Sequence, residues 1–293
     1  MGRSGNLSQS AEWNADVRQL RRFIDLSVSI MESGGEPIPP KIAYHDHAWG
    51  ASRMGFAPLQ DPRSKSKSVQ NILKGIATGR RIKKDAFPGG VAMAWETMRT
   101  DTHHGTHVDA PWHYGPTTAG KPARTIDQMP LDWFMRPGVR LDLRHKPPGS
   151  AVTQDDLQEA LSAIEYALQP MDIVMLWTGV DELWGKPEYL ERYSGLNAES
   201  TNWLLDQGVK VIGTDAWSVD RPPMYMGRDY METGDPSHLW PAHFVGRERE
   251  YAQIEKLAHL GDLTEATGYT VVCFPVSIER ASAGWTRAVA IVD

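Results

Sequence analysis

The sequence predicts an α/β protein in which a single domain contains a mixed β-sheet with flanking helices. Segments typical of buried strands alternate with amphipathic helical segments, strands outnumber helices, and helix-linked crossovers occur together with a C-terminal hairpin. No Ser/Gly-rich or Pro-rich spacer divides the 293 residues, and a chain of this length can bury a full core. The excess of strands over helices and the mixture of crossovers with a hairpin favour a mixed sheet over a doubly wound parallel one.

Helix and strand signals recur along the chain. Thr153 and Asp156 have capping-box spacing, Pro170 ends the periodic apolar pattern that follows them, and Gly208 is a natural helix stop. The expected helices cover 153–168, 199–207 and 247–259. The expected strands cover 22–30, 90–98, 172–178, 209–214, 269–278 and 286–292, the last two forming a closing hairpin.

The first third of the chain gives weaker signals. Residues 1–20 are expected to form an N-terminal arm, with Trp13 as its large apolar anchor, ahead of a domain spanning 21–293. The Gly- and Pro-rich stretch 31–60 predicts loop. Eight Lys or Arg and no acid lie between Arg63 and Lys84, within the basic segment 61–86. A solvated surface is expected there, and a site for an anionic partner is the alternative.

Composition excludes several classes of protein. The net charge of −6 does not favour a nucleic-acid binder, and no apolar run is long enough to cross a membrane. Cys273, the one cysteine, lies in an apolar strand pattern and is expected to be packed rather than nucleophilic. The polar N-terminus lacks a secretory signal, so a cytoplasmic protein is expected.

Four of the ten histidines lie between His103 and His113. Glycine, β-branched residues and proline within this stretch argue against a helix. In an extended chain His103, His107 and Asp109 share one face, and His113 can return after the bend at Pro111. Imidazole and carboxylate donors that converge in this way predict a site for Zn²⁺ or Mn²⁺. His104 has the opposite parity and is expected to lie outside the site.

This stretch, His-x-Gly-Thr-His-x-Asp-x-Pro-x-His at 103–113, resembles the signature of the cyclase family of metal-dependent hydrolases, which includes bacterial kynurenine formamidase and isatin hydrolase. Weaker resemblance covers the segments 23–27 and 213–220 and the pair His243 and Glu255. The resemblance implies a swivelling β/β/α-like fold. It also implies that His103, His107 and Asp109 hold a first metal ion, and that His113, His243 and Glu255 form a second site bridged by Asp109.

Some assignments stay open at this point. His259 lies four residues after Glu255, on the same face of the expected helix, and could compete with it as a ligand. His45 and His47 are either a substrate-loop pair or part of an ordinary polar loop. The aromatic residues expected to contact a substrate are Trp112, Tyr114 and Trp217.

The expected chemistry is hydrolysis of an amide, formamide or lactam C–N bond in a small, aromatic substrate. A divalent ion lowers the pKa of a bound water from about 15.7 towards ~7 and polarises a carbonyl. If only one ion binds, His113, His243 and Glu255 are free for acid–base catalysis. A metal-dependent cyclase or lyase of a polyketide-like pathway and a non-catalytic, metal-stabilised binding protein are the alternatives. The resemblance and the arm together predict a homodimer or a higher homo-oligomer.

Overall fold

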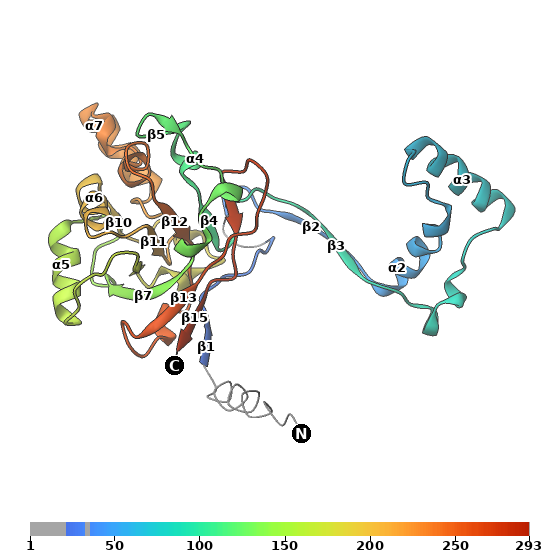
Figure 1. Ribbon diagram of the computed structural model, residues 1–293, viewed down its shortest axis with the longest axis horizontal. Helices are drawn as coiled ribbons and strands as arrows, with labels where there is room; N and C mark the ends of the chain where they lie inside the picture. The colour runs from blue at the N-terminus through green and yellow to red at the C-terminus, as the bar shows by residue number, and fades with distance from the viewer. Residues whose placement is uncertain (1–21, 33–35, 293) are drawn as a thin grey trace, which may run out of the picture. The chain divides into compact units, whose positions relative to one another are not determined.

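The structure is a computed structural model that describes residues 22–32 and 36–292. The expected arm 1–20, with Trp13, lies outside the described residues. The described chain divides into two compact units, a main unit that contains 22–32, 36–39 and 101–292, and a second unit formed by 40–100 (Figure 1).

The main unit is built around a nine-stranded sheet, which is mixed, as the sequence predicts. Its four central strands are parallel and its flanking strands are antiparallel. In sheet order the strands are β1 (Arg22–Asp25), β15 (Val289–Val292), β13 (Tyr269–Val272), β7 (Met135–Asp142), β9 (Ile173–Trp177), β11 (Val211–Thr214), β12 (Ala252–Glu255), β4 (His107–Asp109) and β14 (Ala283–Trp285). The α/β class and the mixed sheet with flanking helices are therefore confirmed.

Helices and small ladders surround this sheet. The helices are α4 (Pro111–Tyr114), α5 (Gln154–Ala163), α6 (Ala198–Asp206), α7 (Pro223–Thr233) and α8 (Pro241–Val245). The two-stranded ladders are β5 (Thr117–Thr118) with β6 (Lys121–Pro122), and β8 (Ala151–Val152) with β10 (Gly195–Leu196).

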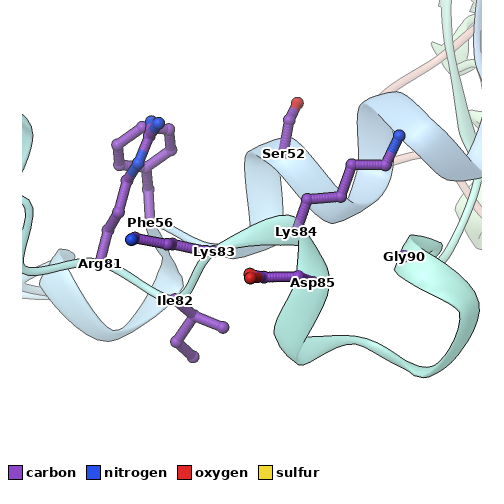
Figure 2. Close-up of a pocket in the computed structure, with 8 residues that line it drawn as sticks. All are labelled: Ser52, Phe56, Arg81, Ile82, Lys83, Lys84, Asp85 and Gly90. Carbon is purple, nitrogen blue, oxygen red and sulfur yellow. The ribbon is translucent and has the colours of Figure 1, made fainter.

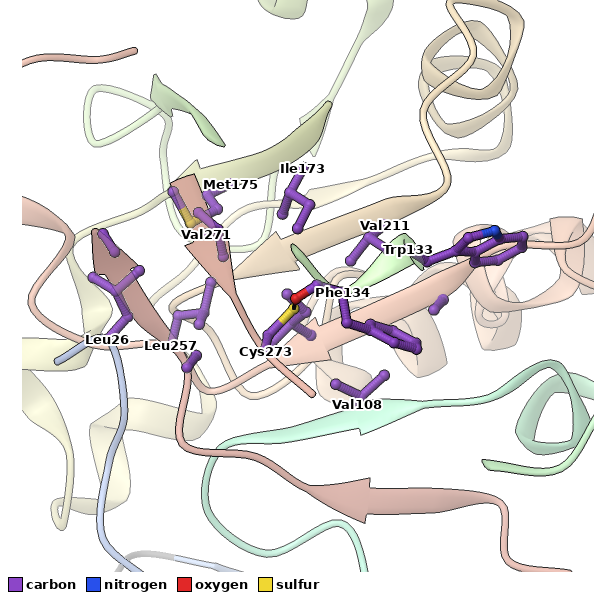
Figure 3. Packing of buried hydrophobic residues seen from close by; sticks show 14 of the residues in the cluster. Leu26, Val108, Trp133, Phe134, Ile173, Met175, Val211, Leu257, Val271 and Cys273 are labelled. Atoms are coloured by element: carbon purple, nitrogen blue, oxygen red, sulfur yellow. Dashed lines mark hydrogen bonds between the residues drawn. The ribbon is translucent and has the colours of Figure 1, made fainter. Parts of the chain in front are cut away.

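Central strand β9 is buried on both faces, so its side chains contribute alternately to two apolar clusters. Val174 and Leu176 pack with α5, α6 and α8, which cover one face of the sheet. Ile173 and Met175 pack on the other face, in the cluster that also contains Cys273 (Figure 3). Cys273 is fully buried, as the sequence predicts, and burial raises the pKa of its thiol well above the usual value.

The predicted helix over 247–259 is wrong. Four buried residues of this stretch form β12, which pairs in parallel with β11 and antiparallel with β4. The good helix formers of this stretch do not decide its structure, because a four-residue segment enclosed between two strands gains more from ladder pairing and burial. The first expected helix starts at the Thr153–Asp156 capping box but ends at Ala163, before Pro170.

The second unit contains the β2–β3 ribbon and two helices (Figure 1). Its elements are β2 (Lys41–His45), α2 (His47–Met54), α3 (Lys65–Thr78) and β3 (Trp95–Arg99). The expected loop 31–60 is thus wrong for 41–54. All five residues of β2 pair antiparallel with β3, and the Asp46 side chain caps α2 by accepting from the Trp49 N–H.

All eight basic residues between Arg63 and Lys84 are exposed, as expected for a solvated surface. Three of them, Arg81, Lys83 and Lys84, line a cavity of about 720 Å³ within this unit (Figure 2). Whether an anionic partner uses this surface stays a prediction. None of the helices in the described part of the chain has the length and apolar character needed to cross a membrane.

Candidate metal centre

Strands β4 and β12 hold half of the predicted ligands. His107 and Asp109 lie on one face of β4, and Glu255 pairs directly with His107 from the end of β12. All three side chains are buried. His107 Nε2 lies 3.2 Å from Asp109 Oδ1 and 3.6 Å from Glu255 Oε2. Because β4 is also paired with β14, these three donors are fixed by hydrogen-bond ladders on both sides.

His103 reaches the same place from a turn rather than from a strand. The turn before β4 passes through Gly105 at φ +62°, where a Cβ atom would lie 2.9 Å from Ile30 Cγ1. His103 Nδ1 lies 2.9 Å from Asp109 Oδ1. The predicted convergence is therefore present, but strand alternation explains it only for His107 and Asp109.

Two short helices bring in the remaining histidines. Pro111 begins α4, which turns the chain back so that the His113 ring lies 4.2 Å from the His103 ring, centroid to centroid. His243, on α8, has its ring centroid 5.3 Å from that of His113. The structure thus gathers all six side chains that the sequence predicts as ligands.

The donor atoms form two overlapping triads that share Asp109. One triad is His103, Asp109 and His113, and the other is His107, Asp109 and Glu255. This grouping differs from the two sets that the family resemblance implies. Both Asp109 oxygens are buried, and apart from imidazole nitrogens, His103 Nδ1 at 2.9 Å and His107 Nε2 at 3.2 Å from Oδ1, they meet no donor among the described residues. A buried carboxylate enclosed by imidazoles in this way fits a divalent cation of the Zn²⁺ or Mn²⁺ type.

Hydrogen bonds to the far side of the ring orient two of the histidines, His107 and His243. His107 Nδ1 bonds the Gly105 carbonyl at 2.9 Å, and His243 Nδ1 bonds Asp220 Oδ2 at 2.5 Å. Each contact fixes the tautomer and leaves Nε2 facing the site, as metal-binding histidines require. Asp220 also accepts from the backbone N–H of His243. Sequence reasoning missed Asp220, although the segment 213–220 that contains it carries part of the family resemblance.

The pKa values of the two central carboxyl groups, Asp109 and Glu255, are shifted in opposite directions. Burial alone would raise the pKa of Asp109, but the neighbouring histidines, His113 foremost, outweigh burial and hold it well below its usual value. Burial and the negative charge of Asp109 raise the pKa of Glu255. Two carboxyl groups whose pKa values are shifted in opposite directions can take separate roles, one permanently ionised and one able to exchange a proton.

The two helix-borne histidines differ as well. Burial and repulsion by the other histidines lower the pKa of His113 to about 4, despite the attraction of Asp109. Burial opposes the charge of His243, but the hydrogen bond and the charge of Asp220 outweigh it and raise the pKa to about 9. Without a bound ion, His113 is therefore neutral and His243 is charged at pH 7.

Two other histidines lie away from this cluster. His104 is buried, and its Nε2 bonds the Ile38 carbonyl, in agreement with its opposite parity. His259 is exposed, and its Nδ1 bonds the Asp25 carbonyl at 2.8 Å. The expectation that His259 shares a helix face with Glu255 is wrong, because Glu255 ends a strand.

The predicted substrate-contacting residues differ in accessibility. Trp112, next to His113, is 44% exposed, whereas Tyr114 is 2% exposed and packs behind the histidines against Tyr251. Trp217 is half-buried and donates its indole N–H to Glu36. His45 lies in the second unit, where its ring stacks on Trp49 with a centroid distance of 4.0 Å. His47 begins α2 of the same unit.

Comparison with known families decides the identity of this arrangement. A family model described as "Putative cyclase" matches residues 24–221. The chain belongs to this cyclase family. The match includes the whole 103–113 signature and Asp220, so the resemblance inferred from the sequence is confirmed.

The curated relatives that match this chain are distant in sequence. The kynurenine formamidase of Salinibacter ruber is 28% identical over 195 residues, which cover 66% of this chain and 77% of that protein. Cyclase-like protein 1 of Oryza sativa subsp. japonica is 24% identical over 251 residues, 84% of this chain and 76% of the rice protein.

Solved structures share the fold over almost the whole chain. Isatin hydrolase A from Ralstonia solanacearum has a TM-score of 0.69 at 18% identity, with all of both chains covered. An isatin hydrolase bound to the product analogue thioisatinate has a TM-score of 0.67 at 19% identity, covering 98% of this chain and 99% of that one. This member of the cyclase family therefore has an isatin hydrolase-like fold.

Proposed function

We propose that this cyclase-family protein is a metal-dependent hydrolase that cleaves an amide, formamide or lactam C–N bond of a small aromatic substrate. The observation that carries the proposal is the cluster of six side chains centred on Asp109, whose buried carboxylate is enclosed by imidazole nitrogens. Relatives named kynurenine formamidase and structural neighbours named isatin hydrolase support the bond type.

Zn²⁺ or Mn²⁺ would be held at Asp109, with one ion or two. His103 and His113 complete one triad, and His107 and Glu255 complete the other. A bound ion acidifies water towards neutral pKa and polarises the substrate carbonyl. The ladder-held His107 and Asp109 have little freedom to move, so they orient this chemistry rather than take part in proton transfer.

Proton transfer falls to the residues with shifted pKa values that are not needed as ligands. If a single ion binds at the His103–Asp109–His113 triad, Glu255 is not a ligand, and with its raised pKa it accepts a proton from the attacking water and returns it to the leaving nitrogen. Asp220 orients the His243 ring so that its Nε2 lies 3.8 Å from Glu255 Oε1. If two ions bind, Glu255, His243 and His113 are all ligands, and the proton acceptor is another group.

Aromatic contacts support the substrate class. Trp112 is exposed beside His113, and its ring offers a stacking surface for an aryl group. Trp217 has its indole N–H engaged by Glu36, so it contacts a substrate through its ring face. Tyr114 is too buried to contact a substrate and instead supports the His113 and His243 rings.

Metal analysis combined with a small substrate screen tests the proposal. The purified chain should contain Zn²⁺ or Mn²⁺ and hydrolyse N-formylkynurenine, isatin or a related formamide or lactam. A chelator should abolish turnover, and the ion should restore it. Ring closure without amide hydrolysis would favour the cyclase or lyase alternative, and bound metal without any turnover would favour a binding protein. Hydrolysis that persists in chelator and without metal would refute the proposal.

We further propose that two copies of the chain form a homodimer through the second unit. Helix α3 exposes Val69, Leu73 and Ile76, which lie at helical spacing on one face and are each more than half exposed. Tyr44 of β2 is 70% exposed as well. An apolar stripe of this kind marks a protein interface, and two-fold assembly is the commonest solution.

Light scattering tests the assembly. The full chain should have twice the monomer mass, and Leu73→Glu should convert it to a monomer. A chain that begins at Arg21 tests whether the predicted arm contributes. A monomeric full chain would refute the dimer, and an unchanged mass after truncation would refute only the role of the arm.

A further inference from the structure

His103 is the one member of the Asp109 cluster that neither a strand nor a helix holds. It lies in the turn before β4, so its backbone groups have no ladder partners. Its N–H is bound by Asp101 Oδ1 at 2.9 Å, and its carbonyl accepts from the ammonium of Lys256 at 2.6 Å. The position of the His103 backbone therefore depends on two side chains, while the ring Nε2 lies 3.1 Å from Ser282 Oγ.

The backbone of Lys256 is itself held by two hydrogen bonds. Lys256 follows Glu255 at the end of β12, with its backbone in the left-handed region at φ +60°. Its N–H donates to the Ala216 carbonyl at 2.9 Å, and its carbonyl accepts from Thr106 Oγ1 at 2.5 Å. Because the backbone is fixed in this way, the side chain starts from a defined point beside the metal-binding turn.

The Lys256 ammonium has a buried counter-ion. Its Nζ lies 2.7 Å from Glu36 Oε1, and the two side chains are only 3% and 5% exposed. The other Glu36 oxygen accepts the indole N–H of Trp217 at 3.2 Å. A buried ammonium without a partner is costly, so Glu36 holds the Lys256 ammonium in place beside the His103 carbonyl.

We propose that the buried Glu36–Lys256 ion pair positions His103 for metal binding by fixing the His103 carbonyl. Glu36 and Lys256 are positioning residues in this proposal and touch neither metal nor substrate. The inference rests on the proposed metal site. It gives Lys256, which is adjacent to Glu255, and Glu36, which is far away in sequence, a function beyond stabilising the fold.

Metal affinity and folding stability separate this role from a purely structural one. Lys256→Met and Glu36→Gln should each weaken Zn²⁺ or Mn²⁺ binding to the metal-free chain, measured by competition with a chelating dye. The expected loss is roughly 10- to 100-fold, which is typical for groups that orient a ligand. Lys146→Met is the control, because it removes a partly buried ion pair with Asp156 on α5 and should leave metal affinity unchanged.

The double variant Glu36→Gln/Lys256→Met makes the distinction sharper. It leaves no unpaired buried charge, so it should recover thermal stability lost in Lys256→Met. Metal affinity should stay low, because the His103 carbonyl still lacks its donor. Metal affinity equal to that of the natural chain in a folded double variant would overturn the inference while leaving the proposed function intact. A natural chain that binds neither ion would overturn both.

Discussion

The candidate centre has a strand-held half and a loop-held half, and the two halves are fixed by different means. His107, Asp109 and Glu255 lie on β4 and β12, where ladders on both sides of β4 determine their positions. His103, His113 and His243 come from a turn and two short helices. Side chains from remote segments, including Lys256, Ser282 and Asp220, hold this second half in place.

This difference separates two kinds of sensitivity. A substitution in the strand-held half removes a donor but leaves the backbone ladder intact, so the chain should fold without its metal. A substitution among the remote side chains leaves every donor present but allows a ring to turn, so metal binding should weaken without being lost. The two halves can therefore be tested separately.

The largest effect is expected in the strand-held half. Asp109→Ala removes the carboxylate common to both triads, so metal retention and turnover should fall below detection while the chain stays folded. Metal content, turnover and thermal unfolding measure the three properties. Asp172→Asn is a matched control, because Asp172 is equally buried but bonds only Tyr166 and Gln169. Full metal occupancy and normal turnover in Asp109→Ala would remove Asp109 from the site.

An intermediate effect is expected at Glu255. Glu255→Gln keeps the shape but removes the proton acceptor, and such groups contribute roughly 100- to 10,000-fold to rate. His259→Ala should change turnover little, because His259 is exposed and bonded to the Asp25 carbonyl. Steady-state kinetics of both variants give the ranking. A larger loss in His259→Ala would show that Glu255 had been wrongly preferred.

The same division explains what the sequence could predict. Period-two alternation places His107 and Asp109 on one face, and the motif names the histidines around them. The Thr153–Asp156 capping box identifies the start of α5, and Gly208 marks the end of α6. These signals are local, and the structure confirms them.

Long-range pairing is what the sequence could not reveal. The segment that contains Glu255 has the composition of a helix and becomes a strand because β11 and β4 enclose it. Glu36 lies 220 residues before Lys256, and Asp220 lies 23 before His243. No periodicity links such partners, since only the folded backbone brings them together. The β2–β3 ribbon of the second unit is unpredictable for a related reason. Its two strands are about fifty positions apart, and the residues around β2 are typical of turns.

The smallest effect on metal binding is expected at Asp220, in the loop-held half. Asp220→Asn keeps a hydrogen-bond acceptor but loses the charge, so metal affinity should fall roughly tenfold. A clearer readout is the stability of the metal-free chain. Burial lowers the pKa of His243, but Asp220 foremost, together with Glu255 and Asp109, raises it from an ordinary 6.5 to about 9, which corresponds to about 3 kcal/mol of stabilisation by the protonated ring.

The sign of this pH dependence follows from the direction of the pKa shift. Because the folded chain binds the His243 proton more tightly than the unfolded chain, the stabilisation is complete below pH 6.5 and is lost as the pH rises through 9. Urea unfolding in chelator, at steps from pH 6 to pH 9.5, should show this decline in the natural chain and a flatter profile in Asp220→Asn. Identical profiles would mean that Asp220 does not set the charge of His243, and the orienting role of the remote side chains would then rest on His103 alone.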